Sequence, residues 1–174
     1  ATLGEEAIQK GVKAGVLGLL IVAVFMILWY RLPGLVSVLA LIFYIILMLS
    51  LFKLMPVTLT AAGMAGLILS IGIAIDANIL IFERMKEEIA AGKGLLESIK
   101  EGFSRAWLSI RDSNLSSLIS AVILFWFGSS LIKGFALTLM IGILVSMFTA
   151  ITVTRTLLLA LGFRNRVGLA KFLF

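Results

Sequence analysis

The fold of this chain follows from one stretch, Gly72-Ile73-Ala74-Ile75-Asp76-Ala77-Asn78-Ile79-Leu80-Ile81-Phe82-Glu83-Arg84. Asp76 lies inside an apolar run that begins after Pro56 and reaches no other charged residue before Glu83. In the hydrocarbon layer of a bilayer a carboxylate costs about 2.5–3.5 kcal/mol on insertion scales, and such residues mark functional positions. Asp76 is therefore the candidate functional residue. The alternative is a structural hydrogen bond between Asp76 and a Ser or Thr of a neighbouring helix.

The composition indicates an integral membrane protein. Hydrophobic residues make up 61% of the 174 residues and charged residues 14%, whereas soluble domains have roughly half and a quarter. The absence of cysteine and histidine excludes disulfides, thiol catalysis and the usual zinc ligand sets. No phosphate loop or facing pair of carboxylates is present, so we expect neither an enzyme nor a nucleotide site. The net charge of +6 is interpreted as a signal of membrane topology, with no nucleic-acid partner.

Five segments are predicted to cross the bilayer as helices, which need about 20 residues each. They cover residues 12–30, 34–52, 57–82, 113–128 and 132–161, within a transmembrane domain of residues 12–162. The fourth segment is short and needs Ser113 and Asn114 in its first turn. Residues 1–11 form a juxtamembrane lead-in and residues 163–174 a basic tail. The expected fold is therefore an all-α membrane protein whose first partner is the lipid bilayer.

Residues 83–112 form the only long polar segment, which Gly92-Lys93-Gly94 divides in two. After the glycines, apolar residues recur at helical spacing: Leu95, Leu96, Ile99, Phe103, Ala106, Trp107 and Ile110. This pattern predicts an amphipathic helix on the cytoplasmic membrane surface. The alternative is a helix docked against the end of the bundle.

The basic residues predict the orientation in the membrane. With five crossings, eleven of them fall on the side of the 83–112 loop and the C-terminus, and four on the other side. The positive-inside bias then places the C-terminus in the cytoplasm and the N-terminus outside, in a multi-pass protein of the cell (inner) membrane. Because an external N-terminus without a signal peptide is unusual, we expect the chain to be a piece of a larger protein.

Two rows of small residues predict which helices pack together, because small side chains allow close approach in membranes. The fifth segment carries Gly134, Thr138, Gly142, Ser146, Ala150 and Thr154, and the third carries Ala62, Gly66, Ser70 and Ala74, reaching Asn78. We therefore expect these two helices in the middle and the first two outside. Asp76 shares a face with Gly72 and Glu83, about 160° around the helix from Asn78. Asp76 should therefore face another span or a partner protein.

Residues 72–88, Gly-Ile-Ala-Ile-Asp-Ala-Asn-Ile-Leu-Ile-Phe-Glu-Arg-Met-Lys-Glu-Glu, closely resemble the fourth-helix signature of the SecD family of protein-export membrane subunits. Residues 112–119, Asp-Ser-Asn-Leu-Ser-Ser-Leu-Ile, resemble that family's Asp-Ala-Asn-Leu-Thr-Thr-Leu-Ile, with Asn114 retained. Lys133-Gly134-Phe135-Ala136, Ile141-Gly142-Ile143 and Ser146-Met147-Phe148-Thr149-Ala150 resemble its sixth helix. The Asp-Ala-Asn and Phe-Glu-Arg elements favour SecD over its paralogue SecF.

This resemblance implies membership of the resistance–nodulation–division superfamily, in which each half has six helices. The chain would then hold helices two to six. The family's function would be to assist protein export with the proton or sodium gradient, with Asp76 as the ion-coupling residue and H⁺ or Na⁺ in place of a cofactor. The implied partners are a SecF-like half, the SecYEG translocon and the translocating polypeptide. Supporting or packing roles are expected for Gly72, Asn78, Glu83, Asn114, Gly134, Gly142 and Ser146.

Two other functions are compatible with the residues. The first is half of an exporter of lipids or small molecules in the same superfamily. The second is a scaffold that binds the translocon without transporting anything.

Overall fold

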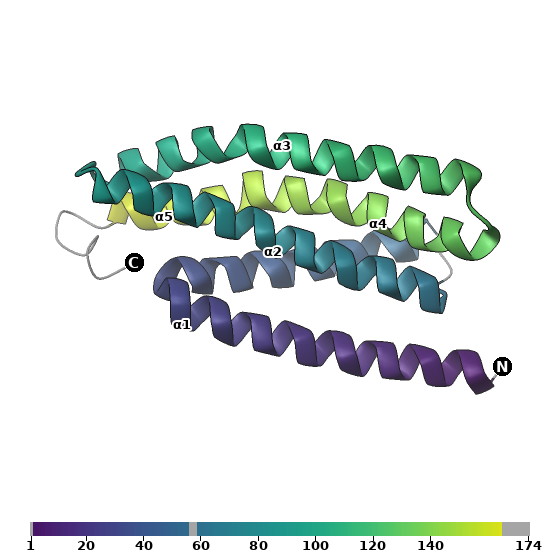
Figure 1. The fold of residues 1–174 in the computed structure, drawn as a ribbon. Helices are drawn as coiled ribbons and strands as arrows, with labels where there is room; N and C mark the ends of the chain where they lie inside the picture. Colours follow the sequence, from purple (N-terminus) through teal and green to yellow (C-terminus); the bar gives the residue numbers. More distant parts are fainter. Residues whose placement is uncertain (1, 56–58, 165–174) are drawn as a thin grey trace.

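The computed structural model describes residues 2–55 and 59–164, and all its regular structure is helical (Figure 1). The elements are α1 (Thr2–Leu54), α2 (Ala61–Ala90), α3 (Leu95–Phe127), α4 (Ser130–Phe148), the π-helix η1 (Thr149–Thr154) and α5 (Arg155–Arg164). Within the described part, four helical stretches are long and apolar enough to cross a membrane: Ile8–Leu54, Ala61–Ala90, Leu95–Phe127 and Ser130–Gly162. The predicted class of all-α membrane protein is confirmed. Most of the predicted tail, from residue 165, lies outside the described residues.

Helix α1 folds back on itself as a hairpin (Figure 1). Arg31 has φ 50° and ψ −114°, values outside the helical region, so the chain reverses between residues 2–30 and 32–54. Pro33 follows in the first turn of the second arm, where its fixed φ and missing N–H are tolerated. A Cβ at Gly34 would lie 1.9 Å from the Met26 carbonyl oxygen, so only glycine allows the two arms to approach this closely. The two arms correspond to the first two predicted segments.

Helix α2 begins at Ala61, later than the predicted start at residue 57, and Thr60 caps it. The Thr60 side-chain oxygen accepts a hydrogen bond from the Gly63 N–H at 3.1 Å, which satisfies one of the unpaired donors of the first turn. At the other end, Gly92 takes φ +89° after the helix ends, a conformation that glycine adopts without strain. The turn at Gly92 reverses the chain so that α3 can return alongside α2.

Helix α3 differs from the prediction, because residues 95–127 form one unbroken helix. The separate amphipathic helix on the membrane surface is therefore not confirmed. The apolar face of its first half, including Ile99, Phe103 and Ala106, is buried within the protein. The helix continues through Arg111 and Asp112, the charges that interrupt the apolar pattern, and these two exposed side chains pair with each other at 2.8 Å.

Helices α2 and α4 pack in direct contact, as the small-residue rows predict (Figure 1). The Thr138 hydroxyl donates a hydrogen bond to the Gly63 carbonyl oxygen at 2.9 Å. A Cβ at Gly66 would lie 2.5 Å from the Phe135 carbonyl oxygen, and one at Gly142 would lie 2.3 Å from the Ser70 side chain. These two glycines are what allow the backbones to come this close.

The prediction that the first two segments both lie outside is wrong for the second arm of α1. Tyr44 and Met48 of this arm are fully buried. The Tyr44 hydroxyl is 2.7 Å from Ser70 Oγ, which itself donates to the Leu67 carbonyl oxygen, so Tyr44 is the donor. The first arm presents most of its large apolar side chains to the outside, Leu28 and Trp29 among them.

Candidate functional site: Asp76 and the polar contacts of α2

Asp76 is exposed on the side of α2 that is turned away from α4. The residues on either side of it, Ile75 and Ala77, are both buried, so the exposed strip at this level of the helix is narrow. Leu69 and Gly72, which precede Asp76 by two turns and one turn, are also exposed. Among the described residues no side chain forms a hydrogen bond or ion pair with Asp76. The expectation that another span of this chain covers it, or that a Ser or Thr bonds to it, is therefore wrong within the described part.

Gly72 keeps the surface beside Asp76 open. A Cβ there would meet no atom within 4 Å, so the glycine is not needed for packing within the described chain. It lies at the edge of an apolar groove of about 140 Å³ between the first arm of α1 and α2, which Gly15, Gly18 and Ile75 also line. Asp76 therefore lies next to an apolar groove whose lining combines these glycines with aliphatic side chains.

Asn78 lies on the opposite side of α2 and joins it to the π-helix. Its side chain is 5% exposed, its Oδ1 accepts a hydrogen bond from Thr154 Oγ1 at 2.8 Å, and its Nδ2 donates to the Ala74 carbonyl oxygen at 3.2 Å. Short π-helical segments inside α-helices are found frequently at functional sites. Asn78 and Asp76 therefore address different neighbours, as the helical spacing predicts.

The other predicted residues occupy three different places. Ser146 is buried and donates to the Ile143 carbonyl oxygen at 2.8 Å. Gly134 lies at the opposite end of α4, where a Cβ would be 3.1 Å from Thr60 Oγ1. Asn114 is buried in α3 and donates through Nδ2 to the Ile110 carbonyl oxygen at 2.8 Å. None of these side chains lies against Asp76, so the predicted set does not form one cluster.

Glu83 accepts a hydrogen bond from the Tyr30 hydroxyl at 2.8 Å and pairs with Lys86 at 3.3 Å. This contact ties the end of the first arm of α1 to α2, one turn beyond the apolar part of the helix. The Lys86 ammonium also lies 4.8 Å from the centroid of the Tyr30 ring. Glu83 is therefore held within the chain, whereas Asp76, two turns away, is not.

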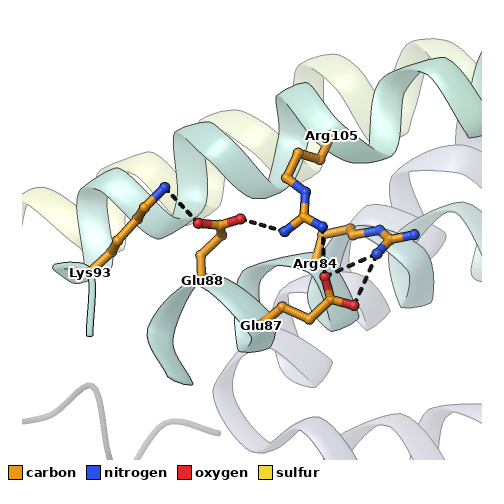
Figure 2. Close-up of polar contacts among 5 residues, drawn as sticks. All are labelled: Arg84, Glu87, Glu88, Lys93 and Arg105. Carbon is orange, nitrogen blue, oxygen red and sulfur yellow. Dashed lines mark hydrogen bonds and ion pairs between the residues drawn. The ribbon is translucent and has the colours of Figure 1, made fainter. Parts of the chain in front are cut away.

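Figure 2 shows a charged network where α2 ends and α3 begins, which the sequence alone did not reveal. Glu88 is 6% exposed and is bonded by Lys93 at 2.7 Å and by Arg105. Arg105 also contacts Glu87 at 3.0 Å, and Arg84 contacts the same carboxylate at 2.9 Å. The hydrogen bonds from Lys93 and then Arg105 lower the pKa of Glu88 from its ordinary value. Arg105 thereby fastens α3 to the end of α2.

The comparisons with known proteins agree on one family. Residues 1–164 match the family described as "Protein export membrane protein SecD/SecF, C-terminal". The chain belongs to this family.

Among its relatives, protein translocase subunit SecD of Thermobaculum terrenum is 60% identical over 162 residues, which cover 91% of this chain and 32% of the relative. The SecD subunit of Synechocystis is 56% identical over 161 residues, which cover 92% of this chain and 34% of the relative. The chain thus spans about a third of the length of the curated relatives it matches.

A solved structure has the same fold. The chain superposes on SecDF of Thermus thermophilus, described as a translocon-associated membrane protein, with a TM-score of 0.92 and 39% identity. The match covers 94% of this chain and 23% of that protein. A second SecDF structure, in the super-membrane-facing form, gives a TM-score of 0.89 over 96% of this chain. The resemblance of the chain to the SecD family is confirmed by these matches.

Proposed function

We propose that this chain is the membrane domain of a SecD-like translocase subunit that uses the proton or sodium gradient to assist protein export. Asp76 is its ion-coupling residue. The observation that carries the proposal is the position of Asp76: an exposed carboxylate in the apolar part of α2 without a partner among the described residues. Carboxylates at such depth bind protons or ions, or pair with a charge from elsewhere.

The depth of Asp76 can be estimated from helix geometry. At 1.5 Å per residue it lies about 22 Å from the start of α2 at Ala61 and about 10 Å before Glu83. With a hydrocarbon layer of about 30 Å, Asp76 is within the bilayer and nearer the end that carries Glu88. Each elementary charge that crosses 100 mV releases about 2.3 kcal/mol, which is the scale of energy that a proton taken up and released at Asp76 would supply.

The missing partner of Asp76 is the second element of the proposal. Gly72 and exposed Leu69 lie on the same strip, and a small residue such as Gly72 allows close helix–helix contact in membranes. A SecF-like half packed against this strip would cover Asp76 and provide the cation or hydroxyl that none of the described residues offers to it. Protonation of Asp76 would then change the charge at the interface between the two halves. This change would couple proton binding at Asp76 to the packing of the two halves.

The hairpin of α1 supports the proposed topology. Counting its two arms separately gives five crossings, helices two to six of a six-helix half, in the cell membrane. The positive-inside bias puts the network of Figure 2 and the C-terminus in the cytoplasm and the N-terminus outside. The names of the relatives support a role in the Sec pathway, with the SecYEG translocon and the translocating polypeptide as partners.

The proposal is tested by Asp76→Asn in proteoliposomes that contain the complete subunit, a SecF-like half and the translocon. We expect gradient-driven stimulation of export to be lost while the halves still co-purify. Asp112→Asn is the matched control, because Asp112 is an exposed carboxylate that pairs with Arg111, and it should retain stimulation. Normal stimulation by the Asp76→Asn protein would refute ion coupling and favour a non-transporting scaffold.

A further inference from the structure

A cationic pocket lies between α3 and the end of the last transmembrane helix, away from Asp76. It has a volume of about 310 Å³ and is lined by Lys100, Phe103, Ser104, Trp107, Ile151 and Arg155. Helix α3 contributes the first four of these residues, and η1 and α5 contribute the last two. The pocket thus combines two cations and a hydroxyl with aromatic and aliphatic walls.

The two cations of the pocket differ from the other basic residues at this end of the bundle. Arg84, Lys86, Lys93, Arg105 and Arg111 all pair with carboxylates. Lys100 and Arg155 form no ion pair among the described residues, although Glu97 and Glu101 are close to Lys100 in sequence. The Arg155 guanidinium lies 5.9 Å from the centroid of the Phe103 ring, and this cation–π contact holds it at the pocket. No carboxylate among the described residues therefore neutralises the positive charge of this pocket.

The pocket lies at the level where lipid headgroups are expected. Thr138 contacts Gly63 near the start of α2, and Arg155 lies about 25 Å further along the same helical rod at 1.5 Å per residue. Since the hydrocarbon layer is about 30 Å thick, Arg155 is close to its opposite boundary. Trp107 has the position and residue type of an interfacial aromatic anchor.

An apolar track leads from the bilayer interior to this pocket. Leu144 and Phe148 are both exposed and precede Ile151 by about two turns and one turn. Leu108 of α3, adjacent to Trp107 in sequence, is exposed as well. A soluble phosphate ester would make no use of such a track, whereas an acyl chain would lie along it.

We propose that Lys100, Ser104 and Arg155 bind the phosphate of an anionic phospholipid, whose acyl chains lie along Leu144 and Phe148. Basic pockets between transmembrane helices bind anionic headgroups in this way, and each Lys or Arg near such a surface strengthens the attraction about fivefold. A lipid bound here would bridge α3 to α5. The site is separate from Asp76 and does not depend on ion coupling.

The reporter for this site is Trp107, which lines the pocket. The substitutions Trp29→Phe and Trp126→Phe leave Trp107 as the only tryptophan among the 174 residues. The protein is placed in phosphatidylcholine vesicles that contain a small fraction of a lipid with brominated acyl chains, which quench tryptophan fluorescence. The brominated lipid is either phosphatidylglycerol or phosphatidylcholine, at equal mole fraction, and the quenching of Trp107 by the two is compared. We expect the anionic lipid to quench severalfold more effectively.

Arg155→Gln should lower this preference about fivefold, and Lys100→Gln, on the exposed side of α3, should lower it similarly. Arg111→Gln is the matched control. Like Lys100→Gln, it removes one positive charge from α3, but Arg111 pairs with Asp112 and does not line the pocket. It should keep the preference within about twofold. If circular dichroism shows that Arg155→Gln is not folded, the comparison of Lys100→Gln with Arg111→Gln tests the proposal.

Three results would overturn the proposal. Equal quenching by the two lipids would show that the pocket has no preference for the anionic lipid. Equal losses in Arg155→Gln and Arg111→Gln would reduce the effect to general surface charge. Inorganic phosphate is added in a further arm, against chloride at the same ionic strength. Release of the quenching lipid by phosphate but not by chloride would mean that the pocket serves a soluble phosphate compound instead.

Discussion

The contact between α2 and α4 makes a sharp prediction about Gly142. In Gly142→Ala, the new methyl group would lie 2.3 Å from both Cβ and Oγ of Ser70 and 2.9 Å from the Tyr44 hydroxyl, whereas ordinary contacts are 3.4–4 Å. Rotation of the Ser70 side chain cannot remove the clash, because Cβ is fixed to the backbone of α2. The two helices must therefore move apart by about 1 Å, and overpacking of this kind destabilises by about 1–3 kcal/mol.

Gly72→Ala is the matched control, since Gly72 lies in the middle of α2 and a Cβ there meets nothing within 4 Å. Replacing an open helical glycine by alanine is expected to stabilise by about 0.5–1 kcal/mol. The two alanine variants should therefore change the free energy of unfolding in opposite directions. The measurement is unfolding by SDS in mixed micelles, followed by circular dichroism and tryptophan fluorescence.

A double-mutant cycle isolates the contact between residues 70 and 142. Ser70→Gly removes the atoms that Gly142→Ala meets, so the double variant should be more stable than the sum of the single effects predicts. Equal stabilities of Gly142→Ala and Gly72→Ala, or strict additivity in the cycle, would show that the backbones are not held this close and that the reasoning is wrong.

Other contacts predict further effects. Because the pKa of Glu88 is lowered in the folded protein, its contribution to stability is present above about pH 4.5, its ordinary pKa, and is lost as the pH falls through the lowered value. The protection factors of residues 89–95, which correct for the slower intrinsic exchange in acid, should therefore fall on acidification below that pH in the wild type, and Glu88→Gln should abolish this pH dependence. Thr154→Val removes the donor to buried Asn78 Oδ1 and should cost about 1–3 kcal/mol of unfolding free energy, whereas Thr154→Ser retains the hydroxyl and should cost less. Unchanged stability of the valine variant would contradict the assigned hydrogen bond.

The sequence-based predictions were correct where they used helical periodicity within one segment. Gly66 and Ser70 on one segment, and Thr138 and Gly142 on another, were assigned to contacting faces from their spacing, and α2 and α4 meet through them. The separation of Asp76 from Asn78 around α2 followed from the same spacing. Helical periodicity is a property of the local backbone, so it can be read without knowing which helix lies opposite.

The predictions were wrong where hydropathy along the chain was used to infer where a helix ends or whether it lies at the outside of the bundle. Arg111 and Asp112 suggested a break between a surface helix and a span, but α3 continues through them as one helix, with both side chains exposed on its surface. The apolar composition of residues 34–52 suggested a peripheral helix facing lipid, yet Tyr44 of this arm is fully buried and bonds to Ser70. In a membrane, apolar residues suit both lipid and helix contacts, so composition does not distinguish an outer helix from an inner one.

By itself, the sequence determined that the protein is a helical membrane protein, which residues form each helix face, and that Asp76 is the carboxylate placed deepest in a span. Only the tertiary structure decided that Asp76 is uncovered, that Thr154 bonds to Asn78 from a π-helix, and that Arg105 fastens α3 to Glu88. Composition and helical spacing are local quantities, set by neighbours in the chain. These contacts join residues on separate helices, and their existence depends on how the helices turn and dock.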